Sequence, residues 1–470
     1  MKEPLLLASI LLSSACSSTT TTTTTTANAH PLAASTVVDR LSSVKIADFS
    51  DQDIVREVLL RNPSIAQAAA VISQAKSQLS LSKSAFLPQL NLHYSYMQAD
   101  APSAYLFKTI DSRKFSPGTD FNNPGSFDNY ETSLELGINL YAGGAHALSE
   151  RMAEQQVDAA RLQQQLVKQE LTAATLQTIL NIEQAQQMLE VSNAAIRLIA
   201  AQLLDTGKHI SAGVALRSDL LSLQARQSAA RDTQLQAVHA LELSKAALAT
   251  LLNISPSDLP QLDDSSYQLH QQYCGQIPTT DDEALGQAQS QHPQLQAANL
   301  ALKTAKLNLE RTAAGSAPSV NLFGQTWVDS PEIGYDDAEL NYSVGLMIDF
   351  NLTDGGALAA RESAARAQLA NAAAAARILQ SKIASEARAA FLNLSSAQSR
   401  LEVARAGTAQ AAEGLRLVKV QYDNQVATIT RFLEAEQMNT QAEMRMIQAQ
   451  NNVRSAQIEL TLATGNFKNF

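Results

Sequence analysis

Charged and aromatic residues are both scarce in this 470-residue chain, at 17% and 5% of the total. The formal net charge of −10 argues against a nucleic-acid partner, because phosphate binding needs clustered lysine and arginine. Seven histidines are scattered through the sequence, with no HExxH motif, glycine-rich phosphate loop or nucleophile elbow. These absences predict a protein that is not an enzyme and has neither cofactor nor metal.

Cysteine is nearly absent as well. The chain has only Cys16 and Cys274, so Cys274 has no partner for a disulfide or a cysteine metal site once Cys16 is removed or modified. We expect Cys274 to be a small, partly buried residue.

Long hydrophobic runs are also missing. No internal stretch approaches the ~20 apolar residues of a transmembrane helix, so a membrane protein remains possible only as a β-barrel, whose signal in each strand is weak. The N-terminal run "PLLLASILL" is too short to span a bilayer but is typical of a signal-peptide core.

Residues 1–29 therefore read as an export signal with a threonine-rich spacer. The small residues of "SSACSS" resemble a bacterial lipoprotein processing site, which would make Cys16 the point of lipid attachment. The alternative is ordinary cleavage after Ala29. The sequence leaves both possibilities open.

Long alanine- and glutamine-rich stretches and an internal duplication dominate the rest of the chain. "NPSIAQAAAVISQAKSQLSLSKSAFLPQLNL" from Asn62 matches "HPQLQAANLALKTAKLNLERTAAGSAPSVNL" from His292. The later glycine pairs, "YAGGA" and "TDGGA", match at a smaller offset, so the first copy has extra residues between its two strands. We expect this connection to be a loop, because it is rich in Pro, Gly, Asn and Asp. We predict a first repeat at 51–253, a linker at 254–280 and a second repeat at 281–466.

Each repeat predicts a helix, two strands and two further helices. The first helices are expected at Asp51 to about Phe86 and at about Asp281 to Ala313; the returning strands are expected at 132–141 and 343–352. The helices that follow have roughly 60 residues, which is about 90–100 Å at ~1.5 Å per residue. Strands of about 10 residues can cross the ~30 Å apolar core of a bilayer when tilted. The predicted fold is mainly α with membrane β, in the form of a duct.

Four strands cannot close a barrel with a lumen, and open edges in lipid cost several kcal/mol for each unpaired backbone group. The chain must therefore oligomerise through its strand edges, and strand physics leaves two, three or four copies open. The alternation predicts a lipid face and a wet face. The lipid face comprises Leu134, Leu136, Ile138, Leu140, Val344, Leu346, Ile348 and Phe350, and the wet face Glu135, Asn139, Asp349 and Asn351.

Aromatic residues near the strand ends are candidates for the membrane interface: Tyr94, Tyr96, Tyr130, Tyr141 and Trp327. Ordinary sheet packing without a membrane is the alternative. Gly143, Gly144, Gly355 and Gly356 mark the barrel-to-helix junctions, because an abrupt change from strand to helix needs positive φ or a close backbone approach.

The sequence resembles the TolC-like family of outer membrane efflux proteins from about residue 50 to 466. The resemblance rests on "NPSIAQAAAVISQAKSQL", "DFNNPGSFDNYETSLELGINLYAGGA", "AGVALRSDLLSLQARQSAA" and their second-copy counterparts. It implies a homotrimer with a twelve-strand β-barrel, four strands per chain, in the outer membrane lipid of a Gram-negative bacterium. It also implies a long α-helical barrel in the periplasm that docks on a periplasmic adaptor protein and an inner-membrane pump.

The resemblance further implies that the breaks between the long helices are periplasmic tips that dock the adaptor. The docking residues would be Gly207, Gly213, Val214, Ala215, Leu216, Val426, Ala427 and Thr428. The alternative is a simple interhelical turn. Asp219 and Glu434 match acidic gate positions, whereas Arg431 stands where an aspartate is common, so opposite-sign pairs are expected to latch the tunnel. The alternative for these three residues is a solvated helix face.

Two other functional classes remain to be weighed. A structural coiled-coil protein would explain the alanine-rich helices but not the paired strands and duplicated prolines. Within the duct interpretation, efflux of drugs or other small toxic molecules competes with type I protein secretion, because a passive tube contains little substrate chemistry.

Overall fold

Apart from helix α5, the same order of helices and strands occurs twice along the described residues. The computed structural model describes residues 51–213, 215–259, 272–333, 339–424 and 426–468, all within one compact unit, Ile46–Phe470. The first series is α3 (Asp51–Arg61), α4 (Pro63–Ser84), β1 (Gln89–Ala99), α5 (Pro102–Asp111), β2 (Phe127–Ala142), α6 (Ala145–Ser211) and α7 (Arg217–Leu252). The second is α9 (Asp281–Gln291), α10 (Pro293–Ala313), β3 (Ser319–Ser330), β4 (Asn341–Asp349), α11 (Ala357–Asp423) and α12 (Ile429–Thr464). Short 3₁₀ turns lie at Pro256–Asp258 and Ala314–Ser316.

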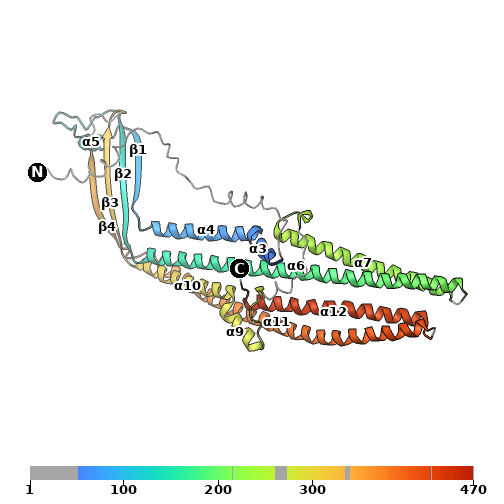
Figure 1. The fold of residues 1–470 in the computed structure, drawn as a ribbon. Helices are drawn as coiled ribbons and strands as arrows, with labels where there is room; N and C mark the ends of the chain where they lie inside the picture. The colour runs from blue at the N-terminus through green and yellow to red at the C-terminus, as the bar shows by residue number, and fades with distance from the viewer. Residues whose placement is uncertain (1–50, 214, 260–271, 334–338, 425, 469–470) are drawn as a thin grey trace. The chain divides into compact units, whose positions relative to one another are not determined.

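The strands lie at one end of this unit, and the long helices extend away from them (Figure 1). Helix α6 packs along α7, α11 packs along α12, and α6 also contacts α12. These contacts give the order α7, α6, α12, α11, in which α7 and α11 are the outer members. The predicted mainly helical fold with paired strands and very long helices is confirmed.

The first helix of each series differs from the prediction, because each is two helices with a break before a proline. The breaks fall at Asn62 and His292, which have extended backbone, with ψ of 126° and 119°. Proline disfavours helical geometry in the residue before it, which explains both breaks. Each residue caps the second helix instead: Asn62 Oδ1 accepts from the Ser64 amide at 3.0 Å, and His292 Nδ1 accepts from the Gln294 amide at 3.3 Å.

The connection between the first two strands was expected to be a loop, and part of it is helix α5. Pro102 occupies the first turn of α5, where its missing N–H costs no hydrogen bond. Strand β2 begins at Phe127, earlier than expected. Strand β4 ends at Asp349, so Phe350 and Asn351 lie in the connection to α11 rather than in the sheet.

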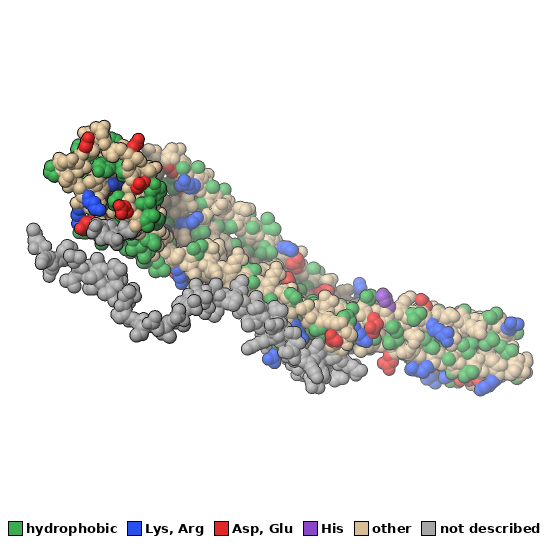
Figure 2. All heavy atoms as spheres, turned by 90° about the horizontal axis from the view of Figure 1, so that it is seen from above, with side chains coloured by type: hydrophobic (Ala, Val, Ile, Leu, Met, Phe, Trp, Pro, Cys, Tyr) green, Lys and Arg blue, Asp and Glu red, His purple; other side chains and the backbone are tan. Residues whose placement is uncertain are grey.

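The four strands form one antiparallel sheet in the order β1-β2-β3-β4. Leu92 lies opposite Leu134, and Leu322 opposite Leu346, so apolar side chains form rows on one face. That face is exposed: Leu92 has a relative accessibility of 71% and Val344 of 73%. The space-filling view shows hydrophobic side chains beside charged ones at the sheet end of the molecule (Figure 2).

The opposite face of the sheet is polar, as predicted. Gln325 Nε2 donates to Glu135 Oε1 at 3.2 Å, and Asn139 Nδ2 donates to Asn321 Oδ1 at 2.7 Å. Trp327 lies opposite Ser133 and therefore on this polar face, whereas Tyr94 and Tyr96 lie with the leucines on the other. The five aromatic residues therefore do not share one face, because the pleat fixes alternate residues on opposite sides.

The hydrophobic core lies between the helices. One cluster near the middle of α6 joins Val55, Leu176, Leu248 and Ile458, and a second near the helix tips joins Ile199, Leu223, Val418 and Phe432. Among the residues described, no helix is both long and apolar enough to cross a membrane.

Candidate functional site

The glycine pairs lie where each sheet strand passes into a long helix. All four have positive φ: 63° at Gly143, 84° at Gly144, 65° at Gly355 and 89° at Gly356. Gly144 and Gly356 precede the first residues of α6 and α11. Side chains larger than hydrogen are strained in this left-handed conformation, so glycine permits the abrupt change of direction.

Close packing adds a second requirement at Gly143. A Cβ placed there would lie 2.5 Å from the Ala314 carbonyl oxygen and 2.7 Å from the Ala317 Cβ. A Cβ at Gly355 would have no neighbour within 4 Å among the described atoms. The two junctions therefore share a backbone conformation but differ in how tightly the neighbouring chain approaches.

The first tip turn is shorter than predicted. Helix α6 continues to Ser211, so Gly207 lies inside the helix and only Gly213, with φ of 77°, lies in the turn. Leu216 is the N-cap residue before α7 and is 69% exposed. Val214 lies outside the described residues.

The second tip turn is held by backbone hydrogen bonds. The amides of Val426 and Ala427 both donate to the Gln421 carbonyl, at 2.8 and 3.2 Å. Thr428 Oγ1 caps α12 by accepting from the Arg431 amide at 3.3 Å. Val426 is 78% exposed.

An aromatic pair closes the base of this second turn. Phe432 is fully buried and stacks on Tyr422, with ring centroids 5.3 Å apart. Because the turn is firmly packed, Val426 is presented on a fixed support. Among the described residues of the two turns, Leu216 and Val426 are the large apolar side chains most exposed to solvent.

The three predicted gate residues do not contact one another as a group within the chain. Arg431 pairs with Glu434 one turn along α12, at 3.4 Å, and both side chains are more than half exposed. Asp219 accepts from the Leu216 amide at 3.3 Å and so caps the start of α7. The structure of one copy gives these residues local roles, and their pairing between copies stays a prediction.

A buried ion pair that the sequence did not predict joins the two helical hairpins. Arg226 Nε on α7 donates to Glu436 Oε2 on α12 at 2.9 Å, and Glu436 is only 1% exposed. Thr440 Oγ1 donates to the other carboxylate oxygen at 2.9 Å. The partners lie 210 residues apart, so no local spacing indicates the pair.

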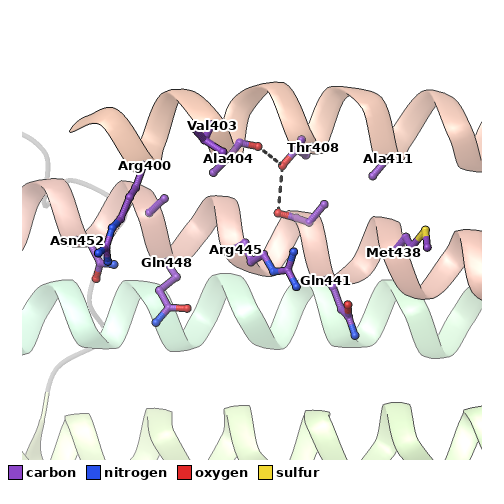
Figure 3. Close-up of a pocket in the computed structure, with 13 residues that line it drawn as sticks. Arg400, Val403, Ala404, Thr408, Ala411, Met438, Gln441, Arg445, Gln448 and Asn452 are labelled. Carbon is purple, nitrogen blue, oxygen red and sulfur yellow. Dashed lines mark hydrogen bonds between the residues drawn. The ribbon is translucent and has the colours of Figure 1, made fainter. Parts of the chain in front are cut away.

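A shallow groove runs between α11 and α12 (Figure 3). Its volume is about 590 Å³, and small side chains such as Gly407, Ala411 and Ala442 form much of its lining. The Thr408 hydroxyl lies within hydrogen-bond distance of the Ala404 and Ala442 carbonyl oxygens, at 2.9 and 3.0 Å, and shares its single proton between the two helices (Figure 3). The other lining residues are Arg400, Val403, Ala404, Met438, Gln441, Arg445, Gln448, Ala449 and Asn452.

No group of three or more His, Cys, Asp and Glu side chains is placed to hold a metal ion among the described residues. Burial raises the pKa of the Cys274 thiol to about 11, so this cysteine is protonated at neutral pH and is a poor nucleophile.

Comparison with known proteins points to one family. The family model for the outer membrane efflux protein matches residues 54–253 and 284–466. The chain is 22% identical over 404 residues to outer membrane efflux protein BepC of Brucella suis, which covers 86% of this chain and 79% of that protein.

Solved structures show the same fold. A membrane protein from Pseudomonas aeruginosa matches with a TM-score of 0.74 at 19% identity, over 90% of this chain and 98% of that chain. The outer membrane protein VceC of Vibrio cholerae matches with a TM-score of 0.73 at 17% identity, over 88% and 95%.

Proposed function

Because the chain belongs to the outer membrane efflux protein family, we propose that three copies of it form the exit duct of a tripartite export system. Membership places the protein in the outer membrane of a Gram-negative bacterium, as a member of a family of efflux channels rather than enzymes. The duct would pass drugs or other small toxic molecules from a periplasmic adaptor and an inner-membrane pump to the outside.

The observation that carries the proposal is a sheet with one apolar face, one polar face and two outer strands. β1 and β4 each pair on one side only within the described residues. In lipid, every unpaired backbone N–H or C=O costs several kcal/mol, so these edges need partners. Joining β4 of one copy to β1 of the next closes the sheet, with the polar face around the passage.

The helices support the same arrangement. The outer helices α7 and α11 carry exposed apolar residues along their length. On α11, Ile378, Leu392, Val403 and Leu417 recur at helical spacing, with exposures of 70%, 59%, 74% and 48%. Contact between α11 of one copy and α7 of the next, which has 36 residues from the tip, would bury Leu392, Val403 and Leu417 and continue the sheet closure into a tunnel.

Purification from outer membranes tests the assembly. We expect a heat-modifiable trimer that conducts ions in a planar bilayer, and a deletion strain with raised drug susceptibility that the intact gene restores. A deletion strain with normal drug susceptibility but lost protein secretion would assign the duct to type I secretion instead. If both phenotypes were unchanged, the transport proposal would be wrong.

Adaptor docking is proposed for the tips, with Leu216 and Val426 as apolar contacts supported by Gly213, Ala215, Ala427 and Thr428. Exposed large apolar side chains on a packed support are typical of protein contact sites. Leu216→Asp is expected to leave conductance unchanged and to abolish restoration of drug resistance. Restoration at the level of the unchanged protein would refute this docking role.

A latch between copies is proposed for Asp219, Arg431 and Glu434. Three-fold symmetry would repeat each charge around the tip, so Arg431 of one copy would face acidic groups of the next. Arg431→Ala is then expected to raise the open probability of single channels. An unchanged open probability would leave Arg431 with its local pairing to Glu434 alone.

Cys16 lies outside the described residues, and we propose it as a site of lipid attachment. Labelling cells with radioactive palmitate should mark the protein and not its Cys16→Ser variant. If neither protein takes up the label and the mature N-terminus follows Ala29, ordinary signal cleavage would be assigned instead.

A further inference from the structure

Helix α5 lies across the polar face of the sheet at the end far from the glycine junctions. It lies in the connection between Ala99, the last residue of β1, and Phe127, the first residue of β2, whereas the glycine junctions lie at the opposite end of the sheet. Tyr105 of α5 packs edge-to-face on Phe127, with ring centroids 5.2 Å apart. Asn341 of β4 donates to the Asp111 carbonyl at 3.0 Å, so α5 reaches across to the fourth strand.

The parity of the strands shows which face these contacts use. Phe127 and Glu131 alternate with the outward-facing residues of β2 and share the side of Glu135. Asp329 lies opposite Glu131, and Asn341 lies opposite Trp327, which is on the polar face too. All these contacts of α5 to the strands therefore fall on the face that, in the proposed trimer, surrounds the passage.

A three-charge cluster fastens the helix to this face. Lys108 Nζ lies 2.8 Å from Asp329 Oδ1 and also donates to Glu131 Oε2. Asn129 Nδ2 donates to the same Asp329 oxygen at 2.8 Å. Asp329 is 1% exposed and Asn129 is 5% exposed, whereas the residues of the outer strands β1 and β4 are mostly exposed.

Lys108 is the only positive group in this cluster. Burial by itself lowers the pKa of Lys108, but hydrogen bonds to Asp329 and Glu131 outweigh it and leave the pKa above its ordinary value. The lysine is thus charged at neutral pH. Without it, two carboxylates would face each other directly across neighbouring strands, an arrangement that is destabilising.

Three copies of α5 are large compared with the width of the passage in the proposed trimer. A barrel of twelve tilted strands has a diameter of roughly 24 Å, measured from backbone to opposite backbone. Three helices of about 10 Å diameter, side by side, need a circle of roughly 22 Å. Three copies of α5 would therefore fill most of the outer mouth.

We propose that α5 is a constriction at the outer mouth of the duct, held against the passage wall by Lys108 through Glu131 and Asp329, and that it limits the size of what leaves. The inference rests on the proposed trimeric duct. Lys108 is a positioning residue, because it acts by fixing the helix rather than by touching cargo.

The test measures single-channel conductance of the full-length protein in planar bilayers. Lys108→Met removes the charge but keeps the aliphatic stem, and we expect conductance to rise by about two-fold or more as the helices leave the mouth. Lys114→Met is the matched control, because Lys114 lies in the same connection and is exposed. It should conduct like the unchanged protein.

Two further variants keep the proposal decidable. The exchange Lys108→Glu with Glu131→Lys preserves the cluster's net charge and should restore the low conductance. Replacing residues 102–111 by a short Gly-Ser linker, together with Glu131→Gln and Asp329→Asn, removes the helix without leaving bare carboxylates. Combined with Arg431→Ala, which is expected to open the tip, this variant should also make cells sensitive to vancomycin, which is too large for ordinary porins.

The failure of the inference differs from the failure of the proposed function. If the linker variant forms trimers and conducts like the unchanged protein, α5 does not constrict the mouth, although the duct stands. If the unchanged protein forms no conducting channel, the duct proposal itself falls.

Discussion

Single residues at the sheet-to-helix junctions combine two constraints that the sequence shows as one motif. The repeated glycine pairs indicated a change of backbone direction, and positive φ at all four positions agrees with this. The close approach of Ala314 to Gly143 was not predictable from the sequence. It depends on the packing of the end of α10 against the end of β2, and the two are far apart in the sequence. Glycine is thus needed for conformation at both junctions and for space at only one.

Alanine at the two junctions should separate these constraints. Gly355→Ala is expected to cost about 1–2 kcal/mol for the left-handed conformation alone. Gly143→Ala should cost about 1–3 kcal/mol more, because its Cβ would overlap the Ala314 carbonyl. Urea unfolding of the purified protein measures the difference, and equal costs would contradict the crowding seen at Gly143.

His292 makes the stability of the second repeat depend on pH. Burial lowers the pKa of His292, although Glu386 acts in the opposite direction, and the neutral ring accepts the Gln294 amide. A lowered folded-state pKa means that the stabilisation is complete above the ordinary value of about 6.5. It is lost as the pH falls from there through the lowered pKa, because the unfolded chain binds the proton more readily.

His292→Asn should remove this dependence. Asn62 performs the same capping role in the first repeat, so asparagine fits the position. We expect the variant to match the unchanged protein at pH 8 and to keep a higher thermal midpoint at pH 5. Parallel falls in both midpoints between pH 8 and 5 would show that other groups cause the acid sensitivity.

At the scale of helices and strands, local rules predicted most elements and missed those that depend on distant contacts. The long helices after the glycine pairs follow from runs without proline, and the strands follow from strict alternation. The breaks at Asn62 and His292 were missed, although each stands before a proline, which disfavours helical geometry in the preceding residue. Helix α5 was missed because Pro, Ser and Gly around it favour a loop, whereas contacts to Glu131, Phe127 and Asp329 stabilise it.

The buried ion pair between Arg226 of α7 and Glu436 of α12 is expected to contribute to the stability of the contact between the two hairpins. Arg226→Met would leave Glu436 buried without its cation, which typically costs about 3–5 kcal/mol. The double variant Arg226→Met, Glu436→Leu should recover most of this loss, because no buried charge remains. Chemical unfolding gives both values.

A surface pair supplies the control for this experiment. Arg405 and Glu402 lie 2.8 Å apart on α11, but both side chains are more than half exposed. Exposed pairs contribute little, so Arg405→Met should unfold like the unchanged protein. If it were as destabilised as Arg226→Met, loss of the long side chain rather than burial of the carboxylate would explain the effect.

At the scale of the whole molecule, the sequence predicted the need for further copies but not the surfaces that meet. The four-strand count and the two faces were readable from alternation. The position of α11 and α7 as outer helices follows only from the contact between α6 and α12. Adaptor and gate residues are predictions that a single copy leaves open.

Two exposed valines should separate assembly from docking. Val403 lies in the apolar stripe of α11, and Val426 lies at the tip; they are 74% and 78% exposed. Val403→Asp is expected to abolish the heat-modifiable trimer, because it would bury an unpaired carboxylate between copies. Val426→Asp should leave the trimer intact and abolish drug resistance. A stable trimer from Val403→Asp would exclude the stripe from the interface.

The two long helical hairpins, α6–α7 and α11–α12, are built from helices of equal length. Helices α6 and α11 each have 67 residues from their glycine pairs, and α7 and α12 each have 36. In a three-fold assembly, the rim would consist of six fingers of matched length in alternation. A binding protein could not distinguish the α6–α7 tips from the α11–α12 tips by helix length. Only side chains such as Asp219 and Arg431 would distinguish them.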